Sequence, residues 1–199
     1  MRVLAFSDVH GDLSLIEKIK QASKDCDLIL CCGDITPLQG KTMDVARKIG
    51  TFDVKVLAIP GNFELPNEIE NMCTELGWIN LHGRSAEISG QLFSGCGGGN
   101  IGPFHTPYEL SEHLFKEILD KLDTSRSFVF ISHCPPKGFL DEPRQGLHVG
   151  SDVIREFVEQ KQPKLQFCGH IHESGGKETR VGNTRVINVA KRIKLLDIK

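Results

Sequence analysis

The chain has 199 residues, of which 39% are hydrophobic and 25% charged, and its formal net charge is −2. This composition excludes an intrinsically disordered chain and leaves enough apolar side chains for a sizeable core. The near-neutral charge gives no general attraction for nucleic acid, and the length predicts a single domain spanning residues 1–199.

The sequence lacks features typical of membrane or secreted proteins. The apolar stretch at residues 1–6 is too short for the hydrophobic region of a signal peptide. No later segment approaches the length needed to span a bilayer. The seven cysteines contain no CxxC pair and are typical of reduced, buried thiols rather than of a zinc site. We therefore expect a cytoplasmic protein without a membrane partner.

Short apolar runs predict buried strands, and segments with helical spacing lie between them. In chain order, strands are expected at residues 3–6, 28–32, 54–59, 128–131, 165–168, 186–189 and 193–198. Helices are expected around residues 13–19, 110–122 and 153–158. Residues 78–95 instead predict short strands joined at Gly83 and Gly90. This alternation favours a layered α/β fold.

Polar side chains with metal-binding chemistry follow five of the predicted strands. They are two carboxylates, one amide and four imidazoles: Asp8, His10, Asp34, Asn62, His133, His170 and His172. Taken singly, each is explained as a cap, a turn residue or an ordinary histidine. Because ligands in open α/β sheets collect beyond the carboxyl ends of the strands, all seven can share one crevice. As a set they predict a site for borderline divalent metals such as Mn, Fe, Zn, Co or Ni.

The chain resembles the calcineurin-like metallophosphoesterases over nearly its whole length. Five blocks in order carry the resemblance: Asp8-Val9-His10, Gly33-Asp34, Gly61-Asn62, His133 and Gly169-His170-Ile171-His172. The resemblance implies an α/β fold in which a two-sheet β-sandwich is flanked by helices, giving four αββα layers. It also implies two divalent cations, with Mn expected first, and a small phosphate ester as substrate, hydrolysed by a hydroxide that the paired metals generate.

The resemblance further implies a role for each of the seven residues. One metal is held by Asp8, His10 and His172, and the other by Asn62, His133 and His170. Asp34 bridges the two, because the two oxygens of a carboxylate can face two cations at once. All seven are therefore expected to be both metal ligands and catalytic residues.

Phe63 departs from the family pattern in a way that bears on the reaction. Many members carry a histidine directly after the Gly-Asn pair, where it helps to protonate the leaving group. Such acid catalysis is typically worth about 10²–10⁴-fold in rate, so we expect a phosphodiesterase rather than a phosphomonoesterase. His148 is the leading candidate for a replacement proton donor, ahead of His105, although a solvated loop is the simpler interpretation of both.

Alternative functions and weaker candidates remain open. A slow phosphomonoesterase, a nuclease of the same family and a noncatalytic binding scaffold are the competing functions. The near-neutral charge argues against a nuclease, so nucleic acid is an unexpected but allowed substrate. The seven filled ligand positions argue against a scaffold, which Phe63 alone favours. Glu64 is expected to support the site or lie on the surface, and Asn100, after Gly97-Gly98-Gly99, is a weak candidate for substrate contact.

Overall fold

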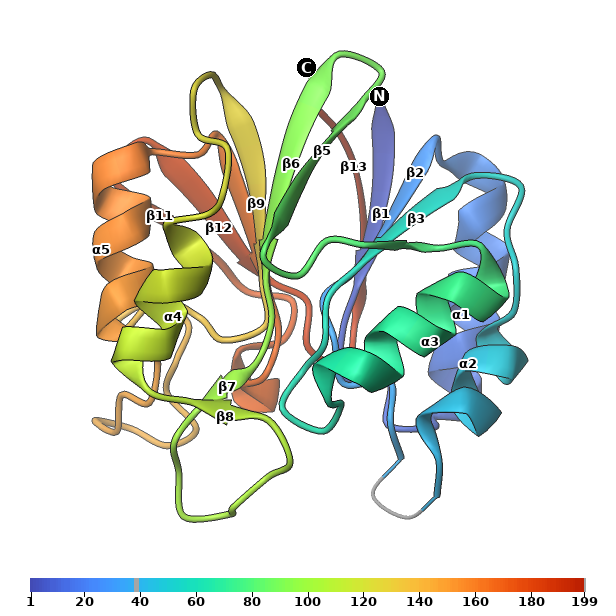
Figure 1. Cartoon of the computed structure of the whole chain (residues 1–199), viewed down its shortest axis with the longest axis horizontal. Helices are drawn as coiled ribbons and strands as arrows, with labels where there is room; N and C mark the ends of the chain where they lie inside the picture. Colours follow the sequence, from blue (N-terminus) through green and yellow to red (C-terminus); the bar gives the residue numbers. More distant parts are fainter. Residues whose placement is uncertain (38–39, 199) are drawn as a thin grey trace.

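The computed structural model describes residues 1–37 and 40–198. Two β-sheets pack face to face, and helices cover the outer face of each sheet (Figure 1). The expected helix–sheet–sheet–helix layering is therefore confirmed. No helix in the described part of the chain is both long and apolar enough to cross a membrane.

The first sheet contains five strands, in the order β13 (Ile193–Asp197), β1 (Arg2–Phe6), β2 (Leu28–Cys31), β3 (Lys55–Ala58) and β4 (Ile79–Asn80). The strands from β1 to β4 run parallel, and β13 pairs with β1 in the antiparallel sense. Its outer face is covered by α1 (Leu13–Ala22), α2 (Thr42–Ile49) and α3 (Pro66–Leu76), with the short 3-10 helix η1 (Ser23–Asp25) after α1 (Figure 1).

The second sheet contains six strands, in the order β11 (Glu178–Val181), β12 (Thr184–Asn188), β10 (Leu165–Cys168), β9 (Phe128–Ser132), β6 (Gln91–Cys96) and β5 (Arg84–Ile88). Its four inner strands run parallel, and each edge strand is antiparallel to its neighbour. Its outer face is covered by α4 (Glu112–Leu119) and α5 (Asp152–Lys161) (Figure 1). The remaining elements are a small ladder of β7 (Gly99–Asn100) with β8 (Glu109–Leu110), and the 3-10 helix η2 (His172–Ser174).

The core follows from the alternation of side chains along each strand. In β1, Leu4 and Phe6 face the helices, whereas Val3 and Ala5 face the second sheet. Both faces are buried, which is why the parallel strands are continuous apolar runs in the sequence. The neighbouring thiols Cys31 and Cys32 likewise belong to different clusters, one under the helices and one between the sheets.

Several elements differ from the sequence-based expectation. The helices α2 and α3 were not expected; α2 is only eight residues long and has no side-chain cap, so its signal is weak. Pro66 opens α3 at a position that proline favours. The stripe expected at 110–122 is helical only over Glu112–Leu119, capped by Ser111. The hairpin through Gly90 is confirmed, but Gly83 joins β4 of one sheet to β5 of the other.

The parallel strands of both sheets end at the same edge of the molecule, which is the lower edge in Figure 1. The loops after β1, β2 and β3 therefore face the loops after β6, β9 and β10. This edge is where the sequence places its metal-binding side chains.

Candidate metal centre

The seven candidate ligands lie in loops at this edge. Asp8 and His10 follow β1, Asp34 follows β2, Asn62 follows β3, His133 follows β9, and His170 and His172 follow β10. Both sheets contribute side chains, because loops from the two layers meet where the strands end. The site therefore exists only once the two sheets are packed together.

The backbone of the ligand loops is held in an unfavourable conformation at four of these positions. The φ angles are 56° at Asp8, 44° at His10, 55° at Asp34 and 68° at His170. The left-handed region costs a residue with a Cβ about 1–2 kcal/mol. Residues in such conformations cluster at functional sites, where the surrounding structure enforces them. Four of them among seven candidate ligands favour a functional site over four unrelated turns.

Glycines beside the ligands let the loops approach one another closely. A Cβ built on Gly61 would lie 1.9 Å from Oδ1 of Asp34, and one built on Gly169 would lie 2.4 Å from Oδ2 of Asp8. Real side chains do not tolerate such contacts, so both positions require glycine. Steric crowding therefore explains why glycine precedes Asn62 and His170 in the sequence.

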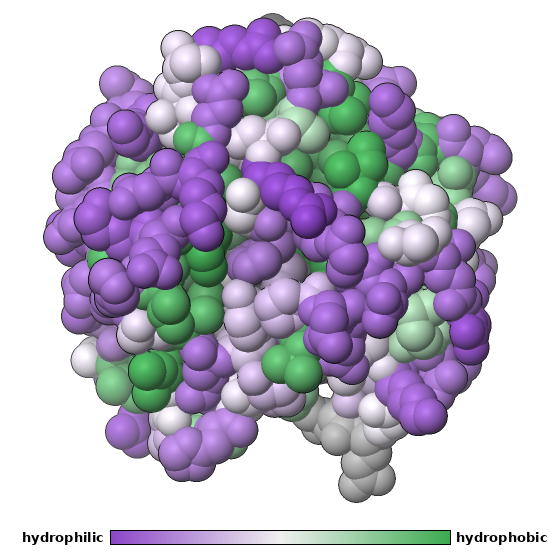
Figure 2. All heavy atoms as spheres, viewed as in Figure 1, coloured by the Kyte–Doolittle hydropathy of each residue, from purple (hydrophilic) through white to green (hydrophobic). Residues whose placement is uncertain are grey.

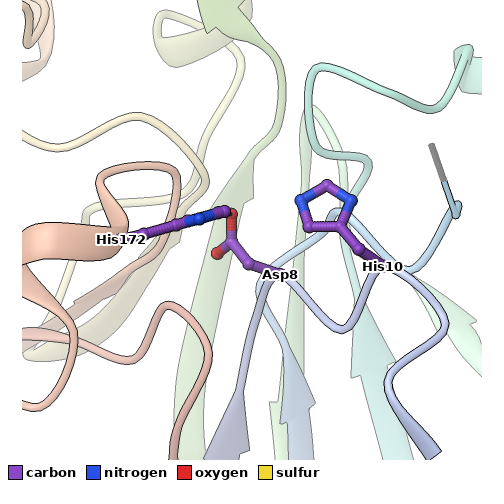
Figure 3. Close-up of side chains that lie close together, drawn as sticks. All are labelled: Asp8, His10 and His172. Carbon is purple, nitrogen blue, oxygen red and sulfur yellow. The ribbon is translucent and has the colours of Figure 1, made fainter.

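The first group of ligands consists of Asp8, His10 and His172, whose coordinating atoms all lie within 4.8 Å of one another. Figure 3 shows the carboxylate of Asp8 between the two imidazole rings. Nε2 of His172 is 3.1 Å from Oδ1 of Asp8. The His172 side chain is 42% exposed, whereas Asp8 is fully buried, so this side of the site is open to solvent.

The second group of ligands surrounds the amide of Asn62. Its Oδ1 lies 2.9 Å from Nε2 of His133 and 2.8 Å from Nδ1 of His170. Oδ2 of Asp34 lies 3.5 Å from Nε2 of His133 and 3.4 Å from Nε2 of His10. Asp34 thus touches a histidine of each group, which is where a bridging carboxylate must lie.

A second set of coordinating atoms within 4.8 Å of one another consists of Asp8, Asp34 and His133. Both carboxylates therefore lie close to the boundary between the two groups. The structure brings all seven predicted ligands into one connected cluster.

The hydrogen bonds of the histidines fit a pair of cations. Nδ1 of His133 is 2.8 Å from the carbonyl oxygen of Cys32, and Nδ1 of His10 is 2.9 Å from that of Thr36. Because a carbonyl oxygen can only accept a hydrogen bond, Nδ1 of each ring carries the proton. In the neutral ring, Nε2 then has the lone pair that binds a metal. Nε2 of His133 faces Oδ1 of Asn62, another acceptor, and this contact requires either a second proton or a cation. The donor set of oxygens and imidazoles suits divalent transition metals.

The charges in the site also favour bound cations. Burial by itself raises the pKa of Asp8, but the hydrogen bond from His172 and the charge of His133 hold it well below the usual range. Burial lowers the pKa of His133, yet the negative charge of Asp34 outweighs it and raises the pKa to about 9. Burial and the charge on His133 lower the pKa of His170 to about 4. The buried carboxylates thus attract positive charge to the centre of the site.

Glu64 is fully buried and binds the loops that carry two ligands, so it is not a surface residue. Its Oε2 accepts hydrogen bonds from the N–H of Asp34 at 2.9 Å and of Gly61 at 2.7 Å. Its Oε1 accepts from the N–H of Thr36 at 2.6 Å. Burial and the charge of Asp34 raise its pKa to about 7. Glu64 therefore positions the loops of Asp34 and Asn62 without being grouped with the ligands.

Phe63 lies directly against the first group of ligands. Its ring meets the ring of His10 edge to face, with 5.1 Å between the centroids. Its backbone N–H donates to Oδ1 of Asp34 at 3.0 Å. The residue thus orients the carboxylate of Asp34 through its backbone, while its side chain places a hydrocarbon where a histidine would offer a proton.

The two candidate proton donors are not brought into the cluster of seven ligands by any hydrogen bond or ion pair between described residues. His148 uses Nδ1 to bind Asp141 at 2.7 Å and Nε2 to approach Glu142 at 3.1 Å. Hydrogen bonding and the charge of Asp141 raise the pKa of His148. His105 lies in the loop between β7 and β8. The role of His148 as a proton donor stays a prediction.

Asn100 has a structural role at the base of the second sheet. Its Nδ2 donates to the carbonyl oxygen of Gly150 at 3.1 Å, and its Oδ1 accepts from the thiol of Cys134 at 2.9 Å. These bonds tie the glycine-rich loop to the loop that follows His133, and they use the amide atoms that substrate would need.

Sequence reasoning missed two residues that hold loops at this edge. Asn188 donates through Nδ2 to the carbonyl oxygens of Gly169 and Ile171, which flank His170. His82 accepts from the N–H of Gly97 through Nδ1 at 2.9 Å, and its Nε2 lies 2.9 Å from the hydroxyl of Tyr108. A polar residue at the end of a predicted strand was the available signal for Asn188. His82 has no comparable signal, because its partners are distant in the sequence.

Comparisons with known proteins agree with this geometry. A family model for calcineurin-like phosphoesterases matches residues 1–174. The uncharacterized protein MJ1162 of Methanocaldococcus jannaschii is 30% identical over 196 residues, which cover 94% of this chain and 87% of that protein.

Two solved structures have a similar fold. The protein TT1561 of Thermus thermophilus has a TM-score of 0.72 at 18% identity, over 100% of this chain and 99% of that one. The phosphopantetheinyl hydrolase PptH of Mycobacterium tuberculosis has a TM-score of 0.61 at 14% identity, over 94% and 88%. At these identities the two structures show the fold alone. The match of the family model over most of the chain, together with the relative at 30% identity, shows that this chain belongs to the calcineurin-like phosphoesterases.

Proposed function

We propose that the chain is a dinuclear metal-dependent phosphoesterase that acts mainly on small phosphodiesters. The convergence of the candidate ligands carries this proposal. The coordinating atoms of Asp8, His10 and His172 lie within 4.8 Å of one another, as do those of Asp8, Asp34 and His133. Oδ1 of Asn62 lies 2.9 Å from Nε2 of His133 and 2.8 Å from Nδ1 of His170. Bound cations would be held by these atoms and would balance the charge of the buried carboxylates.

The ligand roles follow from the two groups of side chains. Asp8, His10 and His172 would hold one cation, and Asn62, His133 and His170 the other, with Asp34 between them. When bound, the metal pair supplies an activated water and neutralises charge on the phosphoryl oxygens. Manganese is the first candidate, and Fe, Zn, Co and Ni suit the same mixture of oxygen and nitrogen ligands.

The preference for diesters rests on Phe63. A phosphomonoester carries an additional negative charge, and an unactivated alkoxide leaving group needs a proton. The phenyl ring against His10 can supply no proton, and both nitrogens of His148 face carboxylates. Diesters with good leaving groups depend least on acid catalysis, so they are the substrates that this site favours.

The proposal is tested by adding Mn²⁺ to metal-free protein and measuring hydrolysis of bis-p-nitrophenyl phosphate. Asp34→Asn keeps the size of the side chain but removes its charge, and we expect it to lower kcat by at least about 100-fold. His172→Ala should also nearly abolish turnover, with the fold intact. Asp53→Asn, at an exposed position before β3, is the matched control. Normal turnover in Asp34→Asn would contradict the proposal.

Phe63→His tests the diester preference separately. If a missing proton donor limits the reaction, this variant should gain activity on p-nitrophenyl phosphate and on alkyl monoesters, with the larger gain on the alkyl esters. Phe63→Leu, which changes the ring without adding a proton donor, should show no such gain. Equal monoesterase rates in wild type and Phe63→His would refute the role assigned to this position.

A further inference from the structure

Exposed apolar side chains gather around the candidate metal centre. Among the described residues, the large exposed hydrophobic side chains are Leu13, Leu65, Ile101, Phe104, Leu114 and Leu147. All six lie in loops or in the first turn of a helix at the edge where the parallel strands end. Single exposed apolar residues are ordinary, but their concentration at one edge marks a binding surface. In the view of Figure 2, hydrophobic residues appear both near this edge and in the upper half of the surface, among mostly hydrophilic residues.

Two of these side chains follow metal ligands within three residues. Leu13 opens α1, three residues after His10, and its side chain is 64% exposed. Leu65 precedes α3, three residues after Asn62. Because three residues of chain span at most about 11 Å, both lie at the rim of the centre. Phe63, between Asn62 and Leu65, extends the apolar surface toward His10.

The most exposed pair lies on a loop whose two ends touch the ligands. Ile101 is 68% exposed and Phe104 is 86% exposed, between β7 and β8. At one end of the loop, a Cβ on Gly99 would lie 2.9 Å from Cβ of Asn62 and 3.2 Å from Cε1 of His170. At the other end, the N–H of Tyr108 donates to the carbonyl oxygen of Asn62 at 2.9 Å. The loop therefore rises directly from the metal centre.

This loop is ordered by internal hydrogen bonds and not by burial of its apolar side chains. Oε1 of Glu109 accepts from the N–H of Thr106 at 2.7 Å and from its hydroxyl at 2.9 Å. Oε2 of Glu109 accepts from the N–H of Gly102 at 3.1 Å. Glu109 thus fixes the backbone on both sides of Phe104, whose side chain stays exposed.

We propose that the loop and the adjacent leucines bind an apolar ester group of the substrate, a long alkyl or aromatic group on the phosphate. This inference rests on the proposed function and names the substrate class of the same site. The phosphate lies at the metal centre, and the non-reacting ester group extends across Phe63 toward Phe104. Phe104 lies four residues from Tyr108, so it is within about 14 Å of the anchored end of the loop. Both ends of the loop contact residues of the metal centre, which favours a substrate group over a separate partner.

Two substrates with the same leaving group provide the test. Methyl p-nitrophenyl phosphate and octyl p-nitrophenyl phosphate both release p-nitrophenolate when water attacks phosphorus, and the alkyl group stays on the phosphate. The ratio of their kcat/KM values, measured with Mn²⁺ below the micelle-forming concentration of the octyl ester, isolates the contribution of the apolar group. We expect wild type to favour the octyl ester and Phe104→Ser to lower the ratio by about fivefold to 20-fold. Lys20→Ser, at an exposed position in the last turn of α1 and away from this edge, is the control and should leave the ratio within about twofold.

An unchanged ratio in Phe104→Ser would overturn the inference while leaving the phosphodiesterase intact. Calorimetric binding of octyl phosphate gives a readout that does not depend on turnover. Binding that depends on Phe104, with no hydrolysis of either diester, would support the apolar surface and refute the proposed function. Sedimentation with phosphatidylglycerol vesicles that depends on Phe104 would overturn the inference in favour of a membrane surface. A dimer that dissociates in Phe104→Ser would overturn it in favour of self-association.

Discussion

Removing the carboxylate of Glu64 should weaken both the fold and the metal centre, because this side chain joins the loops of Asp34 and Asn62. Glu64→Ala leaves three N–H groups without their acceptor, on Asp34 and Gly61, which are buried, and on Thr36, which is partly buried. Each unsatisfied buried N–H costs about 1–3 kcal/mol, so the gross loss is roughly 3–9 kcal/mol. Relief from burying the carboxylate, together with entry of water, offsets part of it. We expect a net loss of about 3 kcal/mol in the free energy of unfolding.

Glu64→Gln separates the hydrogen bonds from the charge. An amide oxygen at the position of Oε2 still accepts from Asp34 and Gly61, whereas the amide NH₂ then faces the N–H of Thr36. This variant should lose only about 1–2 kcal/mol, the cost of one mismatched donor. Because displaced support of metal ligands typically costs about 10-fold to 100-fold in metal affinity, Glu64→Ala should also bind Mn²⁺ correspondingly more weakly.

Urea unfolding followed by the fluorescence of Trp78, the single tryptophan of the chain, measures the stability change. Titration of metal-free protein with Mn²⁺ measures the affinity. Glu17→Ala, at an exposed position on α1, is the control for removing a glutamate. Surface substitutions usually change the free energy of unfolding by no more than about 0.5 kcal/mol. If Glu64→Ala changed it by no more than that and bound Mn²⁺ as tightly as wild type, the role assigned to Glu64 would be wrong.

Two further predictions concern the packing of the loops. Gly61→Ala would place a methyl group 1.9 Å from Oδ1 of Asp34, so it should displace that carboxylate and abolish Mn²⁺-dependent turnover. The control Gly90→Ala, at φ 81° in a hairpin turn, should cost roughly 1 kcal/mol of stability but keep turnover. An active Gly61→Ala enzyme would contradict this packing. Burial lowers the pKa of His82 from 6.5 to about 4, so its stabilising contribution is complete above pH 6.5 and is lost as the pH falls through 4. The full loss is roughly 3 kcal/mol, and His82→Gln should flatten the decline in unfolding free energy between these pH values; an equally steep decline in the variant would exclude His82 as its source.

The central strands of both sheets and the residues at their ends could be predicted from the amino-acid sequence alone, whereas β7, β8 and β11 were not. Runs such as Val3–Phe6 and Leu28–Cys32 are apolar without interruption because both faces of a parallel strand are buried in this fold. The polar residues that follow each run, such as Asp8 and Asp34, therefore stood out from the apolar pattern. Local sequence was less informative for α2, which is only eight residues long and begins after Lys41 without a side-chain cap, although its apolar residues share one face.

How these side chains meet, and what supports them, depends on contacts between distant parts of the chain. His133 and Cys32 are 101 residues apart, and Asp8 and His172 are 164 residues apart, so no local pattern predicts either contact. The support from Glu64 depends on loops from two strands that are adjacent only in the folded sheet. The exposure of Phe104 is also a tertiary property, because the sequence shows a phenylalanine in a loop but not whether the core covers it. Strand composition is set by burial on each face, whereas the geometry of the site is set by the packing of two sheets.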